Sequence, residues 1–204
     1  MSSRWVVVIP VRDGGKTRLV VPGVDHAALA RAIALDTIEA AAAVADVRVV
    51  STDASLALPG TTFVRETQAR GIGEAVRRGL VGVTGPRAVL LGDLPGLLSA
   101  DLAEALEQAE EHDRSAVPDV EGTGTTLVAA TAGHDLVPSF GPDSWRLHRA
   151  AGFRELAVPA TSTVRRDVDL LEHLTGPLGP RTSAVLGRAS AQKVSSGSTR
   201  HALP

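Results

Sequence analysis

Several stretches of the 204-residue sequence carry side chains that could bind phosphate groups or a metal ion. Asp93 follows the apolar run 88–91, which predicts a buried strand. Its carboxylate should therefore lie where open α/β sheets bind their ligands. Pro95 cannot extend a strand ladder and should turn the chain away, which leaves Asp93 at the rim of the sheet. Such an aspartate can hold a divalent cation against a phosphate, or it can cap the following helix; this stretch alone leaves both roles open.

A second acidic element lies further along the chain, at Asp167 and Asp169. Residues two apart in an extended segment point to the same side. The pair is therefore suited to one or two hard cations, although acidic pairs also serve as helix caps.

A basic loop follows the apolar run 5–11, which includes Pro10 and predicts the first strand. Lys16 and Arg18 lie in this Gly-containing loop, where cations on a flexible backbone can cradle phosphates. The alternative is a solvated basic turn. The Gly-Lys-Thr tripeptide of the loop is not a P-loop, because Pro10 occupies the position of that motif's first glycine.

Three further segments could contact anions. Gly71 and Gly73 open a predicted helix over about 71–83, where a ligand could approach free backbone N–H groups, or where the chain simply makes a tight turn. The loop 119–126 is rich in glycine and hydroxyl residues and can wrap an oxyanion, or connect a hairpin. In segment 140–148, Ser144 and His148 share one face of a predicted helix. A histidine there is more often packed than catalytic, although it titrates near neutral pH.

These side chains require an alternation of strands and helices. Asp25 is expected to cap a helix through about residue 44, and Ser99 or Asp101 to cap another through about 111. Strands are expected at 47–51, 62–64 and 115–118, with right-handed crossovers. The pattern predicts one α/β domain over 1–189, a short helix over 182–189, and a disordered tail over 190–204.

Composition excludes several classes of protein. The net charge of −2 lacks the footprint of a general nucleic-acid binder, and 2% aromatic residues provide few platforms for stacked bases. With no cysteine, the chain has neither disulfides nor thiolate chemistry. The N-terminal apolar run is too short for a membrane span, and no signal-peptide pattern encloses it, so we expect a cytoplasmic protein.

The order of the motifs resembles one family over roughly residues 5–175. It is similar to the CofC/FbiD guanylyltransferases of coenzyme F-420 biosynthesis. The elements that carry the resemblance are, in chain order, Pro10 with Lys16-Thr17-Arg18-Leu19, Gly92-Asp93-Leu94-Pro95, Gly122-Thr123-Gly124-Thr125-Thr126, Phe140-Gly141-x-x-Ser144-x-x-x-His148, and Asp167-Val168-Asp169.

The resemblance implies a Rossmann-like nucleotidyltransferase fold with a mixed, mostly parallel sheet flanked by helices. It implies transfer of GMP from GTP to phosphoenolpyruvate or 2-phospho-L-lactate, with release of pyrophosphate and passage of the product to the next enzyme of the pathway. Asp93, Asp167 and Asp169 would hold Mg²⁺. The implied acid-binding residues are Thr126, Gly141, Ser144 and His148, and the implied nucleotide-binding and catalytic residues are Pro10, Lys16, Arg18, Gly71, Gly73 and Asp93.

Two positions depart from the family pattern. Gly73 stands where the family often has an asparagine, and Leu170 where it often has a threonine. The alternatives are another nucleotidyltransferase of the same fold, of the molybdenum-cofactor or sugar-phosphate type, or a non-catalytic nucleotide-sensing domain. Another nucleotidyltransferase has no reason to carry the segment from Phe140 to His148. Simple sensing needs only the nucleotide half, so three separated acidic positions and a second anion loop argue against it.

Overall fold

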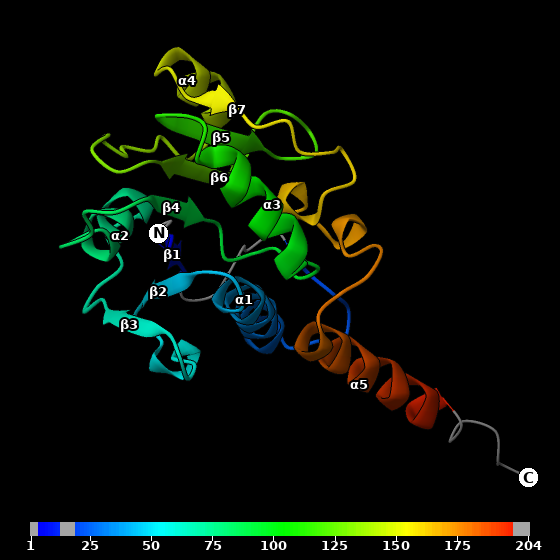
Figure 1. Ribbon diagram of the computed structural model, residues 1–204. Coiled ribbons are helices and arrows are strands. Elements are labelled where there is room, and N and C mark those ends of the chain that lie inside the picture. The colour runs from blue at the N-terminus through cyan, green and yellow to red at the C-terminus, as the bar shows by residue number, and fades with distance from the viewer. Residues whose placement is uncertain (1–3, 13–18, 198–204) are drawn as a thin grey trace, which may run out of the picture.

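The computed structural model of the chain describes residues 4–12 and 19–197 (Figure 1). In these ranges the strands are β1 (Val6–Pro10), β2 (Asp46–Ser51), β3 (Thr62–Arg65), β4 (Arg87–Leu90), β5 (Arg114–Pro118), β6 (Thr125–Ala130) and β7 (Arg154–Glu155). The α-helices are α1 (His26–Ala42), α2 (Ile72–Gly79), α3 (Ser99–Ala109), α4 (Ser144–Ala150) and α5 (Pro180–Gly197). Short 3₁₀ turns lie at Ala54–Leu56, Thr163–Arg165 and Leu171–His173. Among the described residues, no helix combines the length and the apolar character that crossing a membrane would need.

The strands form one seven-stranded sheet in the order β3-β2-β1-β4-β6-β5-β7. The half from β3 to β4 is parallel, whereas β6 runs antiparallel to both of its neighbours and β7 lies parallel to β5. Both predictions of fold class are thus confirmed: the chain is a single α/β domain, and its sheet is mixed but mostly parallel.

Helices cover both faces of the sheet, which is why its central strands are apolar throughout. Successive side chains of a strand point to opposite faces, and β1 shows the result. Val7 and Ile9 join the core beneath α1 and α3, while Val8 packs with residues of α2 and α4. All three side chains are fully buried.

Two predicted helix caps have different outcomes. Asp25 caps α1 as expected, since its carboxylate accepts a hydrogen bond from the Ala28 amide at 2.6 Å. The predicted cap of α3 is wrong: the N-cap is Leu98, which offers no side-chain acceptor. Asp101 instead accepts hydrogen bonds from the amide and hydroxyl of Thr163, each at 2.6 Å. The carboxylate of Asp101 thus forms a tertiary contact, which the local sequence does not reveal.

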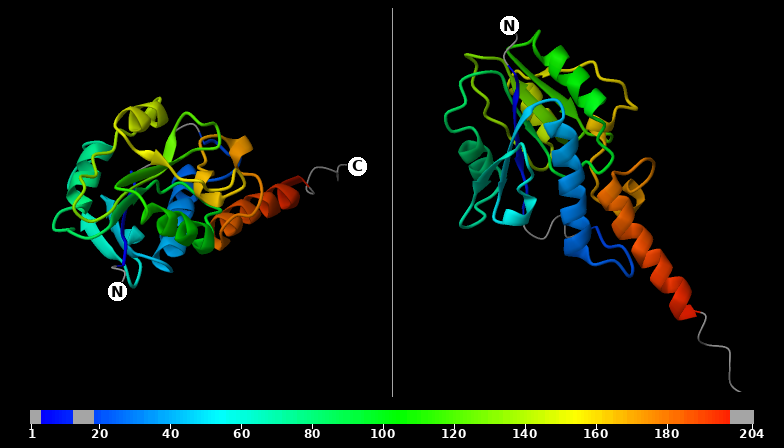
Figure 2. Two further views of the ribbon diagram at one scale, coloured as in Figure 1. Left: turned by 45° about the horizontal axis from the view of Figure 1, so that its top comes forward. Right: turned by 60° about the horizontal axis from the view of Figure 1, so that its bottom comes forward.

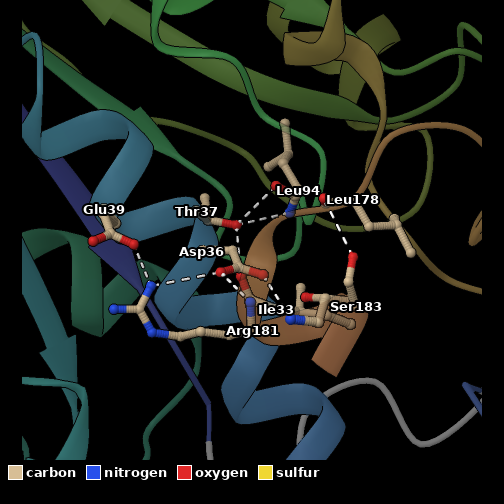
Figure 3. A network of polar contacts seen from close by, with 9 residues as sticks. Ile33, Asp36, Thr37, Glu39, Leu94, Leu178, Arg181 and Ser183 are labelled. Carbon is tan, nitrogen blue, oxygen red and sulfur yellow. Dashed lines mark hydrogen bonds and ion pairs between the residues drawn. The ribbon is translucent and has the colours of Figure 1, made fainter. Parts of the chain in front are cut away.

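Helix α5 leaves the domain at an angle, and its far end projects away from the sheet in both views of Figure 2. Its base is held by α1, as Figure 3 shows. The buried carboxylate of Asp36 accepts hydrogen bonds from the amides of Arg181 and Thr182, at 3.1 and 2.8 Å. α5 is longer than the predicted helix and includes residues 190–197, while 198–204 lie outside the described residues; the division of the chain at Ser190 stays a prediction.

Candidate active site

A cavity of about 980 Å³ opens at the carboxyl ends of β1 and β4. From β1 the chain continues to β2, and from β4 it continues to β5 beyond the opposite edge of this strand pair, so the strand order reverses between β1 and β4. Open α/β sheets bind ligands at such a point. Segments far apart in sequence form its wall: the ends of β1 and β4, the first turns of α1, the Gly/Thr loop before β6, residues 140–144 and residues 167–169.

Asp93 reaches this wall because the backbone on both sides of it is fixed. A Cβ on Gly92 would lie 2.9 Å from Val11 Cγ2, so only glycine lets the chain pass this closely over the end of β1. On the other side, the buried hydroxyl of Thr37 in α1 accepts a hydrogen bond from the Leu94 amide at 3.1 Å (Figure 3). The carboxylate is thereby held at the cavity, as predicted.

The second acidic element meets the first. The Val168 amide donates to the Asp93 carbonyl at 3.0 Å, and Asp167 and Asp169 both line the cavity. The expectation that these two carboxylates share a side agrees with this arrangement. The three aspartates present only hard oxygen donors, which suit a cation such as Mg²⁺; their role as metal ligands stays a prediction.

Asp119 joins this acidic wall, and the sequence reasoning missed it. Carboxylate oxygens of Asp119, Glu121 and Asp167 lie within 4.8 Å of one another. Asp119 also accepts hydrogen bonds from the amides of Thr123 and Gly124, at 3.0 and 2.6 Å, and so closes the Gly/Thr loop. Because it follows β5 directly, the signal that identified Asp93, an aspartate after a buried strand, could have found it.

Hydroxyl groups also line the cavity. Thr125 and Ser144 both line it, and their oxygens lie 3.3 Å apart. The amide of Ser144 does not point a free N–H at the cavity, since it donates to the Gly141 carbonyl at 3.1 Å. Gly141 lines the cavity with φ +132°, a conformation that side chains rarely adopt.

Two residues that the resemblance assigns to acid binding do not line the cavity. Thr126 is fully buried, and its hydroxyl donates to the Val117 carbonyl at 3.3 Å, whereas its neighbour Thr125 faces the cavity. His148 is fully buried as well, with its ring edge-on to Phe140 and Phe153. Burial lowers the pKa of His148 to about 4, so the ring is neutral at physiological pH.

On the nucleotide side, Pro10 lines the cavity, but Gly71 and Gly73 do not. Gly71 is the N-cap of α2, with φ +94°, and Ile72 between the two glycines is the residue that reaches the cavity. Lys16 and Arg18 lie outside the described residues. Arg12, the first cation of the predicted basic loop, lines the cavity. Arg31 also lines it and was not anticipated, since it stands out only as a lone cation in an alanine-rich helix.

Comparison with known proteins identifies relatives over almost the whole chain. The chain is 40% identical to a phosphoenolpyruvate guanylyltransferase of Streptomyces coelicolor, over 91% of its own length and 97% of the relative's. It is 41% identical to a protein of the same name from Salinispora arenicola, over 93% and 97% of the two chains. No protein-family model matches the chain.

Solved structures share the fold at lower identity. A nucleotidyl transferase from Methanothermobacter thermautotroptrophicus superposes with a TM-score of 0.59 and 18% identity, over 84% of this chain and 94% of the other. A Mycobacterium tuberculosis H37Rv protein solved in complex with manganese gives a TM-score of 0.56 and 20% identity, over 85% and 96%. At this identity the likeness shows the nucleotidyltransferase-like fold alone.

The relatives are similar over nearly their full length, and the resemblance of the motifs to the CofC/FbiD enzymes is confirmed. The chain therefore belongs to the family of the phosphoenolpyruvate guanylyltransferases.

Proposed function

We propose that this protein transfers GMP from GTP to the phosphate of phosphoenolpyruvate and releases pyrophosphate, as a step of coenzyme F-420 biosynthesis; 2-phospho-L-lactate is the alternative acceptor. The observation that carries the proposal is that one cavity, in a member of this family, is lined by both carboxylates and hydroxyls. The carboxylates suit a metal-bound triphosphate, and the hydroxyls suit the oxygens of a small phosphorylated acid.

The reaction requires no strong general base. A phosphate oxygen of the acid is already anionic; it forms a bond to the α-phosphorus of GTP while the bond from that phosphorus to the β-phosphate oxygen breaks. The enzyme must align the two phosphates and neutralise their charge. A neutral, buried His148 that does not line the cavity is compatible with such a mechanism.

The roles of the individual residues are taken from the family resemblance and, for the described residues, are supported by the cavity lining. Asp93, Asp167 and Asp169 would hold Mg²⁺, which would neutralise the charge that develops on the phosphates. Lys16 and Arg18 are proposed to contact phosphates, and Arg12 and Arg31 add positive charge along the cavity. Ser144 and Gly141 are proposed to bind the acid.

The biological setting is part of the proposal. The product, in which GMP is joined to the acid through a diphosphate, would pass to the next enzyme of the pathway. We propose the cytoplasm as the location, because the nucleoside triphosphate that the reaction consumes is held there.

Pyrophosphate release tests this function. Purified protein with Mg²⁺ and GTP is given phosphoenolpyruvate, 2-phospho-L-lactate or 3-phosphoglycerate, each in a separate reaction, with ATP in place of GTP as control. We expect release that requires both GTP and the acid. Folded protein that binds GTP but releases no pyrophosphate with any of the acids would contradict the proposal, and so would equal use of ATP.

A further inference from the structure

The hydrogen bonds of His148 determine which of its ring nitrogens carries the proton. The Ser139 amide donates to Nε2 at 2.9 Å. A backbone N–H can only donate, so Nε2 must be the acceptor nitrogen of the neutral ring. Nδ1 therefore carries the proton, and it lies 2.9 Å from the Thr125 hydroxyl oxygen. His148 donates to Thr125.

This tautomer determines whether the hydroxyl groups of Thr125 and Ser144 have a proton left to donate. Thr125 and Ser144 each have one hydroxyl proton. One of these two protons forms the hydrogen bond between the two oxygens, which lie 3.3 Å apart. Since Thr125 accepts from His148, the other proton is left over, and no acceptor for it is recorded among the described residues. Thr125 and Ser144 both line the cavity, which leaves a ligand there as the acceptor for this proton.

The opposite tautomer would remove that donor. If Nδ1 were the acceptor, the Thr125 proton would go to the ring and the Ser144 proton to the Thr125 oxygen. No hydroxyl proton would then remain for a ligand. The protonation pattern of a residue outside the cavity thus decides whether the pair can donate to an anionic oxygen.

We propose that His148 is a positioning residue that, through Thr125, keeps the Thr125–Ser144 pair a hydrogen-bond donor to an anionic oxygen of the phosphorylated acid. This inference rests on the proposed function and deepens it, since it assigns Thr125 to the acid site and gives His148 a role without substrate contact. Burial among Phe140 and Phe153 keeps the ring neutral, so the arrangement does not change across the physiological pH range.

A matched pair of variants tests the proposal. In His148→Asn the amide nitrogen falls near Nδ1 and can still donate to Thr125, whereas in His148→Gln the amide falls near Nε2 and can serve only Ser139. We expect His148→Gln to raise the KM for phosphoenolpyruvate roughly tenfold, the usual effect of losing a hydrogen bond to a charged group. The KM for GTP should stay within about twofold, and His148→Asn should recover most of the affinity for the acid.

A double-mutant cycle shows whether His148 acts through Thr125. Thr125→Val removes the hydroxyl and should raise the KM for phosphoenolpyruvate by itself. Adding His148→Gln to Thr125→Val should then cost less than about twofold more, because the two changes interrupt one chain of hydrogen bonds. Additive losses, equal losses in both His148 variants, or a parallel rise in the KM for GTP would overturn the proposal.

The tautomer can be measured in the wild-type protein, which removes any dependence on how the variants fold. Nitrogen-15 NMR of the histidine rings at pH 7 should show His148 neutral and protonated at Nδ1. A proton on Nε2, or a charged ring, would overturn the inference. Wild-type protein that releases no pyrophosphate with any acid would instead contradict the proposed function. The two failures can be distinguished, because this one is seen in the wild-type protein.

Discussion

At the scale of single residues, the positions of the cavity carboxylates depend on neighbouring residues that carry no charge. Asp93 is held between Gly92, which must lack a side chain, and Leu94, whose amide is bound by Thr37. Asp167 and Asp169 are aligned by the backbone hydrogen bond between Val168 and Asp93. Contacts within the protein hold the backbone of the acidic wall, so removing one carboxylate should change chemistry more than folding.

Asp93→Asn tests the acidic wall directly. The amide keeps the size of the side chain but loses the negative charge that a divalent cation requires. We expect turnover to fall by roughly two orders of magnitude or more, with a urea unfolding midpoint close to that of the wild type. Near-normal turnover in the folded variant would contradict the assignment of Asp93 to the metal.

His148 predicts a pH dependence of stability. Its pKa is lowered from 6.5 to about 4 in the folded protein, so between these values the unfolded chain binds a proton that the folded chain does not. Stability should therefore fall as the pH drops from about 6.5 to about 4, and this contribution should be constant above that window. Urea denaturation of the wild type and of His148→Asn at pH 7.5 and pH 5 measures it. The wild type should lose more stability on acidification than the variant; equal losses would contradict the buried, neutral ring.

At the scale of elements, two neighbouring residues of α1 hold two other parts of the molecule. Thr37 binds Leu94 next to Asp93, while Asp36 caps α5 through the amides of Arg181 and Thr182 (Figure 3). The Gly179 amide also donates to the Pro95 carbonyl at 2.6 Å. The base of α5 and the strand end that carries Asp93 are thus fixed by the same helix.

Asp36→Ala should cost about 1–2 kcal/mol of unfolding free energy, because it removes the cap that satisfies two amides at the start of α5. Glu39→Ala is the matched control, since it removes only the exposed ion pair with Arg181, and should change stability by less than about 1 kcal/mol. Urea denaturation of both variants makes the comparison. Equal destabilisation by the two substitutions would argue against Asp36 as the anchor of α5.

At the scale of the whole molecule, the features that could be predicted are those that depend on local pattern. Apolar runs gave the main strands, and Asp25 marked the start of α1 correctly. The start of α5 could not be predicted in the same way, because its cap, Asp36, is contributed by another helix. The start of α3 likewise depends on a residue far away in the sequence, since Thr163 is hydrogen-bonded to Asp101.

The candidate site shows the same limit. The sequence identifies a Gly/Thr loop, but it cannot say which of two adjacent threonines faces the cavity. Alternating side chains of a strand point to opposite faces, and the register between β5 and β6 shifts at Val117/Pro118. A shift of one residue exchanges Thr125 and Thr126. Arg31 was missed because only the assembled fold brings it to the cavity, whereas Asp119 follows a strand as Asp93 does and could have been found.

The most direct test of the central claim is phosphorus-31 NMR of the complete reaction with Mg²⁺, GTP and phosphoenolpyruvate. The account predicts that the GTP signals are replaced by a pyrophosphate signal and by two coupled signals from an unsymmetrical diphosphate that joins GMP to the acid. Formation of GDP and inorganic phosphate, or unchanged phosphoenolpyruvate beside consumed GTP, would contradict it.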